Sequence, residues 1–397
     1  MQYDFDRVVD RRATDSVKWN NAEMLAYGAD TLPFWVADMD FTVAEPIRRA
    51  LAARVEHAVF GYAVTPESYF SAVCGWYARR HNWQIDPETI CFSPGVVAGV
   101  SYLLALLTEP GNGVIIQPPV YHVFARQIAE AGRRVVDNPL RLGADGRYEM
   151  DFADLAQKAA DPNNKVMVLC SPHNPAGRVW REDELRRLGE ICFANDVFVI
   201  SDEIHNDLLR DGVRHICFPT LFPAEKNRIV TCVSASKTFN LAAFECASVI
   251  IADNTLRQRY QEYLQKTIRL HGPSALAAVA TTAAYAEGEE WLTQLNQYLE
   301  HSLDWLADFV SAQLPAARLI PCDGTYLAWL DVSAYAPDTA ALCKRLLAEA
   351  HVYFEEGELF GTGGAGFLRI NIACPLSMLR EGMARLASFL LQEQNGR

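Results

Sequence analysis

The chain has 397 residues, of which 50% are hydrophobic and 21% are charged, and its formal net charge is −13. This balance predicts an ordered globular protein with more than one compact unit, and the acidic charge argues against a nucleic-acid groove, which needs clustered Lys and Arg. The first residues lack the profile of a signal peptide and no apolar run reaches the ~20 residues of a membrane helix, so we expect a cytoplasmic protein with no membrane partner. Its ten cysteines show no paired metal-ligand spacing and are expected to be reduced thiols.

From residue 46 onward, short apolar runs alternate with segments of helical pattern. The runs are apolar on both faces, and helix-length segments such as Asp183–Asn195 separate them, which predicts crossover connections and a mostly parallel sheet covered by helices. The expected strands are Gly113–Ile116, Val166–Cys170, Val197–Ile200, Ile229–Val233 and Ser248–Ala252. The sequence therefore predicts an α/β fold with a large domain over residues 46–285.

The pattern changes near residue 286. A long amphipathic stretch, Glu290–Leu314, is followed by the strand-like segments Tyr326–Leu330 and Gly366–Ile372 and by a final helical segment. We therefore expect a smaller α/β domain formed by residues 286–397 together with an N-terminal arm, residues 1–45.

Polar residues follow each expected strand of the larger sheet. In such sheets ligands gather beyond the carboxyl ends of the strands. Ser93-Pro-Gly95-Val96-Val97 opens a helical run, so backbone N–H groups there can receive a phosphate. Tyr121 follows the next strand and can stack on a flat ring, and Asn174, in Ser-Pro-His-Asn-Pro-Ala-Gly, can donate its amide to a ring oxygen.

Two ionisable residues continue this series. Asp202 ends a strand, where its carboxylate can pair with a protonated pyridine nitrogen or, alternatively, cap a helix. Lys237 directly follows a strand in Ser234-Ala-Ser236-Lys237; a desolvated amine there can form an imine with an aldehyde, while Ser234 and Ser236 offer hydroxyls to a phosphate. An ordinary loop lysine is the alternative. In chain order these residues supply a phosphate cradle, a stacking ring, an amide, a carboxylate and an amine, which is the set that pyridoxal 5′-phosphate requires.

Three other patterns do not indicate sites. Gly361-Thr-Gly-Gly-Ala-Gly366 has the spacing of a dinucleotide fingerprint, but it precedes a strand and reads better as a turn. Asp38 and Asp40 are expected to have structural or interface roles. The nine histidines form no metal-binding motif, so we assign no metal.

The motifs identify a known family. The chain resembles fold type I pyridoxal-phosphate enzymes and, more narrowly, the carbon–sulfur β-lyases of the MalY/PatB type, which include cystathionine β-lyases. The resemblance covers nearly the whole chain and rests on Val8–Trp19, Phe34–Phe41, Val59–Tyr62, Ser171–Gly177, Ser201–His205, Ser234–Lys237 and Gly366–Asn371.

The resemblance implies further roles. Tyr62 would reach the cofactor phosphate of a second subunit, so a homodimer with shared active sites is expected. Arg369 would hold the substrate α-carboxylate as a bidentate pair, and Trp35 and Val36 would lie over the substrate. His205 would lie beside the cofactor, at a position where many aminotransferases carry Tyr. Tyr121 and Asn174 would contact the substrate as well as the cofactor.

These expectations favour α,β-elimination from S-substituted L-cysteines such as L-cystathionine. Lys237 would hold the cofactor as a Schiff base and then remove the Cα proton, and a thiolate would leave, giving thiol, pyruvate and ammonia. Two alternatives stay open: an aminotransferase that uses the same lysine, and an additional regulatory role in binding another protein. Arg is common in aminotransferases where this chain has Glu245, which lowers the odds of efficient transamination.

Overall fold

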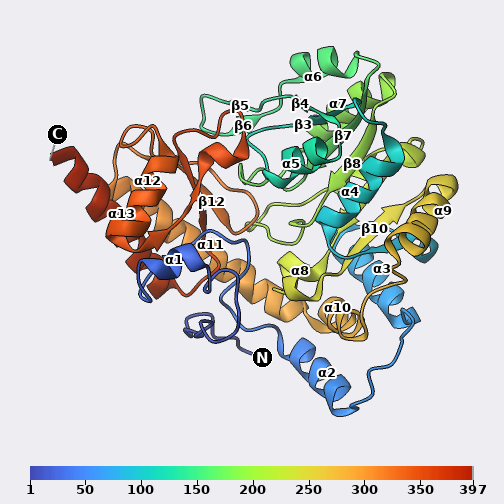
Figure 1. The fold of residues 1–397 in the computed structure, drawn as a ribbon, viewed down its shortest axis with the longest axis horizontal. Helices are drawn as coiled ribbons and strands as arrows, with labels where there is room; N and C mark the ends of the chain where they lie inside the picture. The colour runs from blue at the N-terminus through green and yellow to red at the C-terminus, as the bar shows by residue number, and fades with distance from the viewer. Residues whose placement is uncertain (396–397) are drawn as a thin grey trace.

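The computed structural model describes residues 1–395, and Figure 1 shows helices packed around a larger and a smaller sheet. The larger sheet has the strand order β2-β10-β9-β8-β7-β3-β4. Only β10 runs antiparallel to its neighbours; the others are parallel. These strands are β2 (Ile90–Ser93), β3 (Gly113–Ile116), β4 (Arg134–Asp137), β7 (Asn164–Cys170), β8 (Phe198–Asp202), β9 (Ile229–Val233) and β10 (Ala247–Ile251). The predicted α/β class with a mostly parallel sheet is confirmed.

Helices cover both faces of this sheet, which explains why its strands are apolar throughout. In β9, Val230 and Cys232 point into one core cluster, whereas Ile229 and Val233 point to the opposite face. The first face is covered by α4 (Val96–Leu107), α5 (Val123–Glu130) and α9 (Asn254–Glu262). The second is covered by α3 (Glu67–His81), α6 (Phe152–Ala159), α7 (Glu182–Ala194) and α10 (Ala275–Glu287).

The smaller sheet is antiparallel, with the order β11-β12-β15-β14. Its strands are β11 (Arg318–Leu319), β12 (Leu327–Asp331), β14 (Glu355–Glu356) and β15 (Phe367–Asn371). In Figure 1, α11 (Glu289–Gln313), α12 (Thr339–Arg345) and α13 (Leu376–Asn395) lie around these strands. The domain division expected at residues 45/46 and 285/286 stays a prediction.

The remaining elements are short. The other helices are α1 (Ala22–Ala26), α2 (Glu45–Glu56) and α8 (Ala235–Thr238). Two small ladders pair β1 (Leu32–Pro33) with β13 (Val352–Tyr353) and β5 (Arg141–Leu142) with β6 (Tyr148–Glu149). The 3₁₀ and π turns are η1 (Pro87–Thr89), η2 (Phe218–Leu221), η3 (Lys226–Arg228), η4 (Ala242–Phe244), η5 (Tyr263–Ile268), η6 (Leu346–Ala350) and η7 (Gly357–Phe360). Among residues 1–395, we find no helix with the length and apolar character that crossing a membrane requires.

The sequence missed two strands of the larger sheet. Strand β4 lies at the edge and is partly exposed, so its sequence Arg-Val-Val-Asp lacks the fully apolar pattern of a buried strand. Strand β2 has only four residues between a 3₁₀ turn and the loop before α4. Strand β3 has the same length but contains no polar side chain, whereas β2 ends in Ser93, which weakens its apolar pattern.

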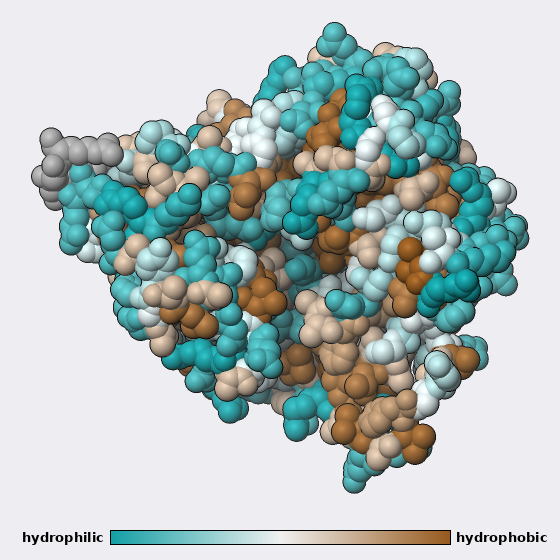
Figure 2. Space-filling model, viewed as in Figure 1, coloured by the Kyte–Doolittle hydropathy of each residue, from teal (hydrophilic) through white to brown (hydrophobic). Residues whose placement is uncertain are grey.

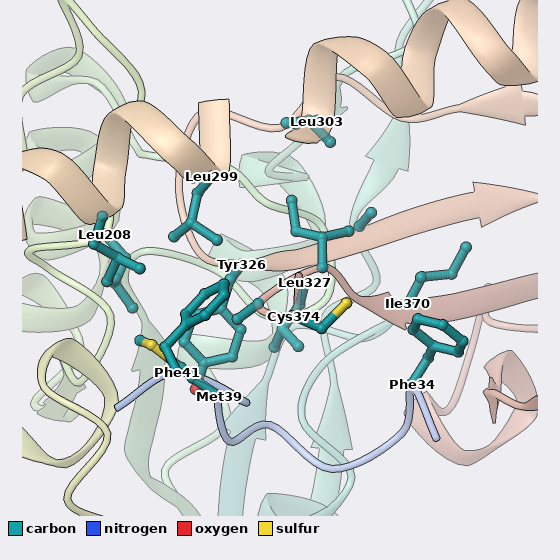
Figure 3. Close-up of a cluster of buried hydrophobic side chains, with 14 of the residues drawn as sticks. Phe34, Met39, Phe41, Leu208, Leu299, Leu303, Tyr326, Leu327, Ile370 and Cys374 are labelled. Carbon is teal, nitrogen blue, oxygen red and sulfur yellow. The ribbon is translucent and has the colours of Figure 1, made fainter. Parts of the chain in front are cut away.

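The N-terminal segment 32–41 runs along the smaller sheet. Strand β1 pairs with β13, the Asn371 amide donates to the Phe34 carbonyl at 2.8 Å, and the Asp40 amide donates to the Ala373 carbonyl at 2.9 Å. Figure 3 shows Phe34, Met39 and Phe41 of this segment among buried side chains that include Tyr326, Leu327 and Ile370 of the smaller sheet and its loops. The packing therefore fixes both ends of the segment between Phe34 and Phe41.

Close packing of Phe34 predicts the effect of a substitution at Gly382. A Cβ atom at Gly382 would lie 2.3 Å from the Phe34 ring, whereas a Cβ at Gly75, also within a helix, would meet only the end of the Arg79 side chain at 3.0 Å. We expect Gly382→Ala to lower the free energy of unfolding by about 1–3 kcal/mol because the added methyl overpacks the core. Gly75→Ala should leave it unchanged or raise it by up to about 1 kcal/mol through helix propensity. Urea unfolding of both variants measures the difference, and equal effects would contradict the packing argument.

Candidate active site

A cavity of about 380 Å³ lies where the two sheets meet. From the larger sheet it is lined at the carboxyl ends of the parallel strands, by Cys170 of β7, Asp202 of β8 and Lys237 after β9. From the smaller sheet it is lined by Glu355 of β14 and Arg369 of β15. Because parallel strands end at one edge of a sheet, residues distant in the sequence converge here.

Most of the residues predicted from the sequence line this cavity. They are Trp35, Val36, Gly95, Val96, Val97, Tyr121, Asn174, Asp202, His205, Ser236, Lys237 and Arg369. Two predicted residues do not. Tyr62 is fully exposed on the segment between α2 and α3, and Ser234 is buried with its hydroxyl donating to the Cys246 carbonyl at 2.6 Å and accepting from the Ser236 amide at 3.0 Å. Ser234 thus caps the turn, whereas Ser236 lines the cavity.

Lys237 lies in the short helix α8 directly after β9. Its Nζ donates a hydrogen bond to the Ala37 carbonyl at 2.6 Å. Burial, together with the nearby Arg369 guanidinium, lowers the pKa of the Lys237 amine to about 8. A substantial fraction of this amine is neutral at mildly alkaline pH, so it can act as a nucleophile or base.

Asp202 ends β8 and is 6% exposed. Burial, with the neighbouring Glu203 carboxylate, raises the pKa of Asp202 to about 7, although a hydrogen bond from the Ile204 amide at 3.1 Å opposes this shift. No helix begins at this residue, so Asp202 does not serve as the helix cap that the sequence left open. A buried carboxyl of this kind ionises readily when a cationic group binds beside it.

Asn174 and Tyr121 are joined through the backbone, because the Tyr121 amide donates to the Asn174 carbonyl at 2.9 Å. The Asn174 side-chain oxygen accepts from Arg369 Nη1 at 3.3 Å. This orientation leaves the amide nitrogen of Asn174 as the donor toward the cavity. Burial raises the pKa of the Tyr121 hydroxyl, so the ring is neutral.

The loop between β2 and α4 offers donors for an anion. Gly95 has φ 94° and ψ 159°, a conformation that a side chain would strain, and it places the first turn of α4 at the cavity. The first N–H groups of a helix have no carbonyl partner within the helix, so Val96 and Val97 can direct theirs at a phosphate. Ser236 adds a hydroxyl from the β9 side.

Arg369 is already paired within the protein. Its Nη2 donates to the Trp35 carbonyl at 2.7 Å and forms an ion pair with Glu355, which lies opposite it in the β14–β15 ladder. Burial raises the pKa of Glu355, although the Arg369 charge opposes the shift. A carboxylate entering the cavity would therefore have to share or displace an existing partner.

Sequence reasoning missed Glu355 and also His122. Burial lowers the pKa of His122 to about 4, and its Nδ1 lies 3.9 Å from a Glu355 oxygen. Glu355 stands in the acidic run Glu355-Glu-Gly-Glu358, in which no signal separates it from its neighbours. Only the strand register identifies it.

His205 contributes a neutral ring. Burial, followed by the charges of Lys237 and Arg369, lowers the pKa of His205 to about 3. Its Nδ1 is buried without a hydrogen-bond partner, so it remains available to a polar group in the cavity.

Two further features do not form sites. Residues 361–366 form a turn that leads into β15, as the sequence suggested. Glu203, His215 and Cys217 lie close together, but Glu203 already accepts hydrogen bonds from Ser201, His215 and the Phe218 amide. These contacts account for the cluster as part of the buried polar core.

Each polar group of pyridoxal 5′-phosphate has a suitable partner among the residues of the cavity. The first turn of α4 and Ser236 suit the phosphate, and Asp202 suits a ring nitrogen that binds a proton. Asn174 suits the ring oxygen and the Lys237 amine suits the aldehyde. A bound polar ring could give the buried nitrogen of His205 a hydrogen-bond partner, and its protonated nitrogen would lower the raised pKa of Asp202.

Comparisons with known proteins agree with this chemistry. The family model for aminotransferase class I and II matches residues 33–386. Cystathionine beta-lyase PatB of Bacillus subtilis (strain 168) is 42% identical over 386 residues, covering 97% of this chain and 99% of PatB. The structure of cystalysin from Treponema denticola, which contains pyridoxal 5′-phosphate, has a TM-score of 0.94 and 33% identity over 99% of this chain and 100% of that chain. A C–S lyase from Staphylococcus hominis with bound pyridoxal phosphate has a TM-score of 0.91 and 34% identity over 98% of both chains.

The raised pKa of Asp202 predicts how stability depends on pH. In the folded, cofactor-free protein Asp202 keeps its proton up to about pH 7, whereas in the unfolded chain it loses the proton near its ordinary pKa of 3.8. Its contribution to the free energy of unfolding therefore falls as pH rises through this window, by up to about 4 kcal/mol. We expect Asp202→Asn to gain stability relative to wild type between about pH 4 and about pH 7, as measured by urea unfolding of the cofactor-free protein.

Asp154→Asn is the control of opposite sign. Burial would raise the pKa of Asp154, but hydrogen bonds from Lys158 and Asn138 outweigh burial and lower it. This variant should lose stability relative to wild type as pH rises toward about 4, and between about pH 4 and about pH 7 its difference from wild type should stay constant. The same pH trend for both variants would contradict the assignment of a raised pKa to Asp202.

Proposed function

The chain belongs to the family of class I and II aminotransferases, and we propose that it is a pyridoxal-phosphate-dependent carbon–sulfur β-lyase for L-cystathionine and related S-substituted L-cysteines. The predicted resemblance to fold type I enzymes of the MalY/PatB type is confirmed by the relatives and solved structures that match nearly the whole chain. The observation that carries the proposal is the convergence of Lys237, Asp202 and Asn174 on one cavity in a chain 42% identical to a cystathionine β-lyase.

Pyridoxal 5′-phosphate, when bound, supplies an electron-poor ring that stabilises negative charge at the Cα atom of an amino acid. Lys237 would hold the cofactor through its amine and later serve as the base that removes the Cα proton, a role for which its lowered pKa of about 8 suits it. Asp202 would keep the ring nitrogen protonated, and Asn174 would donate to the ring oxygen.

Substrate orientation would come from the smaller sheet. Arg369 would bind the α-carboxylate, for which its guanidinium offers parallel N–H donors. Trp35, Val36 and Tyr121 line the cavity, and Trp35 and Val36 would lie over the substrate. With the substrate held in this way, a thiolate leaves from Cβ and water completes the reaction to thiol, pyruvate and ammonia.

The test is an assay of L-cystathionine cleavage with no keto acid present. We expect wild-type protein loaded with pyridoxal phosphate to produce pyruvate and free thiol in equal amounts. Lys237→Ala should lose at least about 10³-fold in kcat, because both the cofactor linkage and the base are removed. Lys158→Ala, on the outer helix α6, is the control and should keep wild-type activity. Turnover only after addition of a keto acid would show an aminotransferase instead.

We infer a homodimer from the exposed surface after α2. Val55, Val59, Phe60, Tyr62 and Val64 are all exposed apolar or aromatic side chains in one stretch of chain. Figure 2 shows apolar residues gathered at the lower edge, where Figure 1 places α2. Exposed apolar surface of this extent favours burial against another subunit. Tyr62, at 114% relative exposure, is then free to reach the partner's cofactor phosphate, as the family resemblance implies.

Hybrid dimers test this arrangement. Tyr62→Ala and Lys237→Ala homodimers should each have little activity. Unfolding and refolding an equal mixture should restore roughly a quarter of the wild-type activity, because half of the dimers are hybrids and each has one intact site. Mixing without unfolding is the control. No recovery in the refolded mixture would contradict a role for Tyr62 across the interface.

A cytoplasmic location also remains a proposal. All ten cysteines are unpaired and most are buried. Free thiols at this number are typical of proteins in a reducing compartment.

A further inference from the structure

Residues 35–40 form a loop, here called the wall loop, whose first three residues, Trp35, Val36 and Ala37, line the cavity. Its backbone carbonyls accept hydrogen bonds from side chains of the site. Ala37 accepts from Lys237 Nζ at 2.6 Å and from the Tyr326 hydroxyl at 2.8 Å. Trp35 accepts from Arg369 Nη2 at 2.7 Å. The position of this backbone therefore determines whether the Lys237 amine and the Arg369 guanidinium can form these hydrogen bonds.

The outer side of the wall loop is held by ionic contacts. Lys18 is fully buried, and its Nζ lies 2.6 Å from Asp40 Oδ2. Trp19 Nε1 donates to Asp40 Oδ1 at 2.8 Å, and Arg11 binds both Asp40, at 2.7 Å, and Asp38, at 2.7 Å. Three donors from the N-terminal arm thus converge on two carboxylates of the loop.

The ion pair between Lys18 and Asp40 depends on the folded structure around it. Burial would raise the pKa of Asp40, but Lys18, Trp19 and Arg11 outweigh it and lower the pKa. A buried lysine such as Lys18 is stable only with a well-placed counterion, so the ion pair fixes where Asp40 can lie. The apolar side chains Met39 and Phe41 hold the same stretch from the core side, as Figure 3 shows.

Asn240 joins the wall loop to the turn that carries Lys237. Its side-chain oxygen accepts from the Met39 amide at 3.0 Å, and its amide nitrogen donates to the Met39 carbonyl at 2.9 Å and the Phe41 carbonyl at 3.1 Å. Asn240 is three residues after Lys237. Asn240 therefore fixes the wall loop relative to Lys237 on one side, and the ionic contacts of Asp38 and Asp40 fix it on the other. Together they set the distance between the Ala37 carbonyl and the Lys237 amine.

We propose that Lys18 is a positioning residue for Lys237: by pairing with Asp40 it holds the wall loop so that the Ala37 carbonyl accepts a hydrogen bond from the free lysine amine. This inference rests on the proposed function, because it concerns the state in which the amine is not bound to cofactor. Lys237 is in this state when it carries the proton taken from the substrate. A fixed carbonyl stabilises that ammonium and keeps it beside the reacting carbon.

Other charges also face the Lys237 amine. Arg369 of β15 lowers its pKa, whereas Asp38 of the wall loop, Asp202 of β8 and Glu355 of β14 raise it. The neutral His205 also lines the cavity. A double substitution at Lys18 and Asp40 leaves Arg369, Asp202 and Glu355 in place, but Lys18 also lies 3.9 Å from an Asp38 oxygen. Loss of this cation beside Asp38 would by itself raise the pKa of Lys237, so a fall in that pKa identifies the lost Ala37 carbonyl.

The test compares wild type with the double variant Lys18→Met/Asp40→Asn, which leaves no buried charge unpaired between the two positions. The measurement is the rate at which cofactor-free protein captures added pyridoxal 5′-phosphate, followed by absorbance across pH. Only the neutral amine reacts, so the pH of half-maximal rate reports the pKa of Lys237. Without a well-placed Ala37 carbonyl the ammonium is less stable, and we expect this pH to fall by about one unit. We also expect kcat of the loaded enzyme to fall by about tenfold or more.

Lys158→Met is the matched control, since it removes another lysine–aspartate pair, that of Lys158 Nζ and Asp154 Oδ2 at 2.7 Å, away from the cavity. It should leave the pH profile unchanged. If the double variant does not fold, Trp19→Phe, which removes the hydrogen bond to Asp40 Oδ1 without changing any charge, tests the same loop and should shift the profile in the same direction. An unchanged profile in a folded variant would overturn the positioning role while leaving the lyase intact. Failure of the wild type to capture cofactor at any pH would refute the proposed function itself.

Discussion

The hydrogen bond from the Lys237 amine to the Ala37 carbonyl joins two parts of the chain that are 200 residues apart in the sequence. One part is the edge of the larger sheet, where parallel strands deliver Asp202 and Lys237 side by side. The other is the N-terminal segment, which runs along the smaller sheet and brings its carbonyl groups to the cavity. The cavity exists because these two parts meet, and neither sheet alone contains a complete set of groups for binding a cofactor and an amino acid.

Burial controls the electrostatics of the cavity. It lowers the pKa of Lys237 and raises that of Asp202, so each is less charged than it would be in water. Arg369 forms an ion pair with Glu355, which lies directly across the strand pair. Such a site would suit the charged groups that we propose it binds, which are a ring nitrogen at Asp202, a phosphate at the first turn of α4 and a carboxylate at Arg369.

Much of this arrangement could be predicted because it depends on local patterns. Apolar runs identified the central strands, and the polar residue after each run identified Asn174, Asp202 and Lys237. What could not be predicted depends on register and direction. Ser234 and Ser236 look equivalent in the sequence, yet one caps the turn and the other faces the cavity. Glu355 is recognised only from its place opposite Arg369, and the wall loop acts through backbone carbonyls, which every residue possesses.

The most direct test of the central claim is to identify the lysine that binds the cofactor. Protein incubated with pyridoxal 5′-phosphate is reduced with borohydride, which fixes the linkage, and its peptides are analysed by mass spectrometry. The account predicts a stoichiometric cofactor mass on the peptide that contains Lys237, with the label absent from the Lys237→Ala protein. A label on another lysine, or no label above background, would contradict the assignment of this cavity as a pyridoxal-phosphate site.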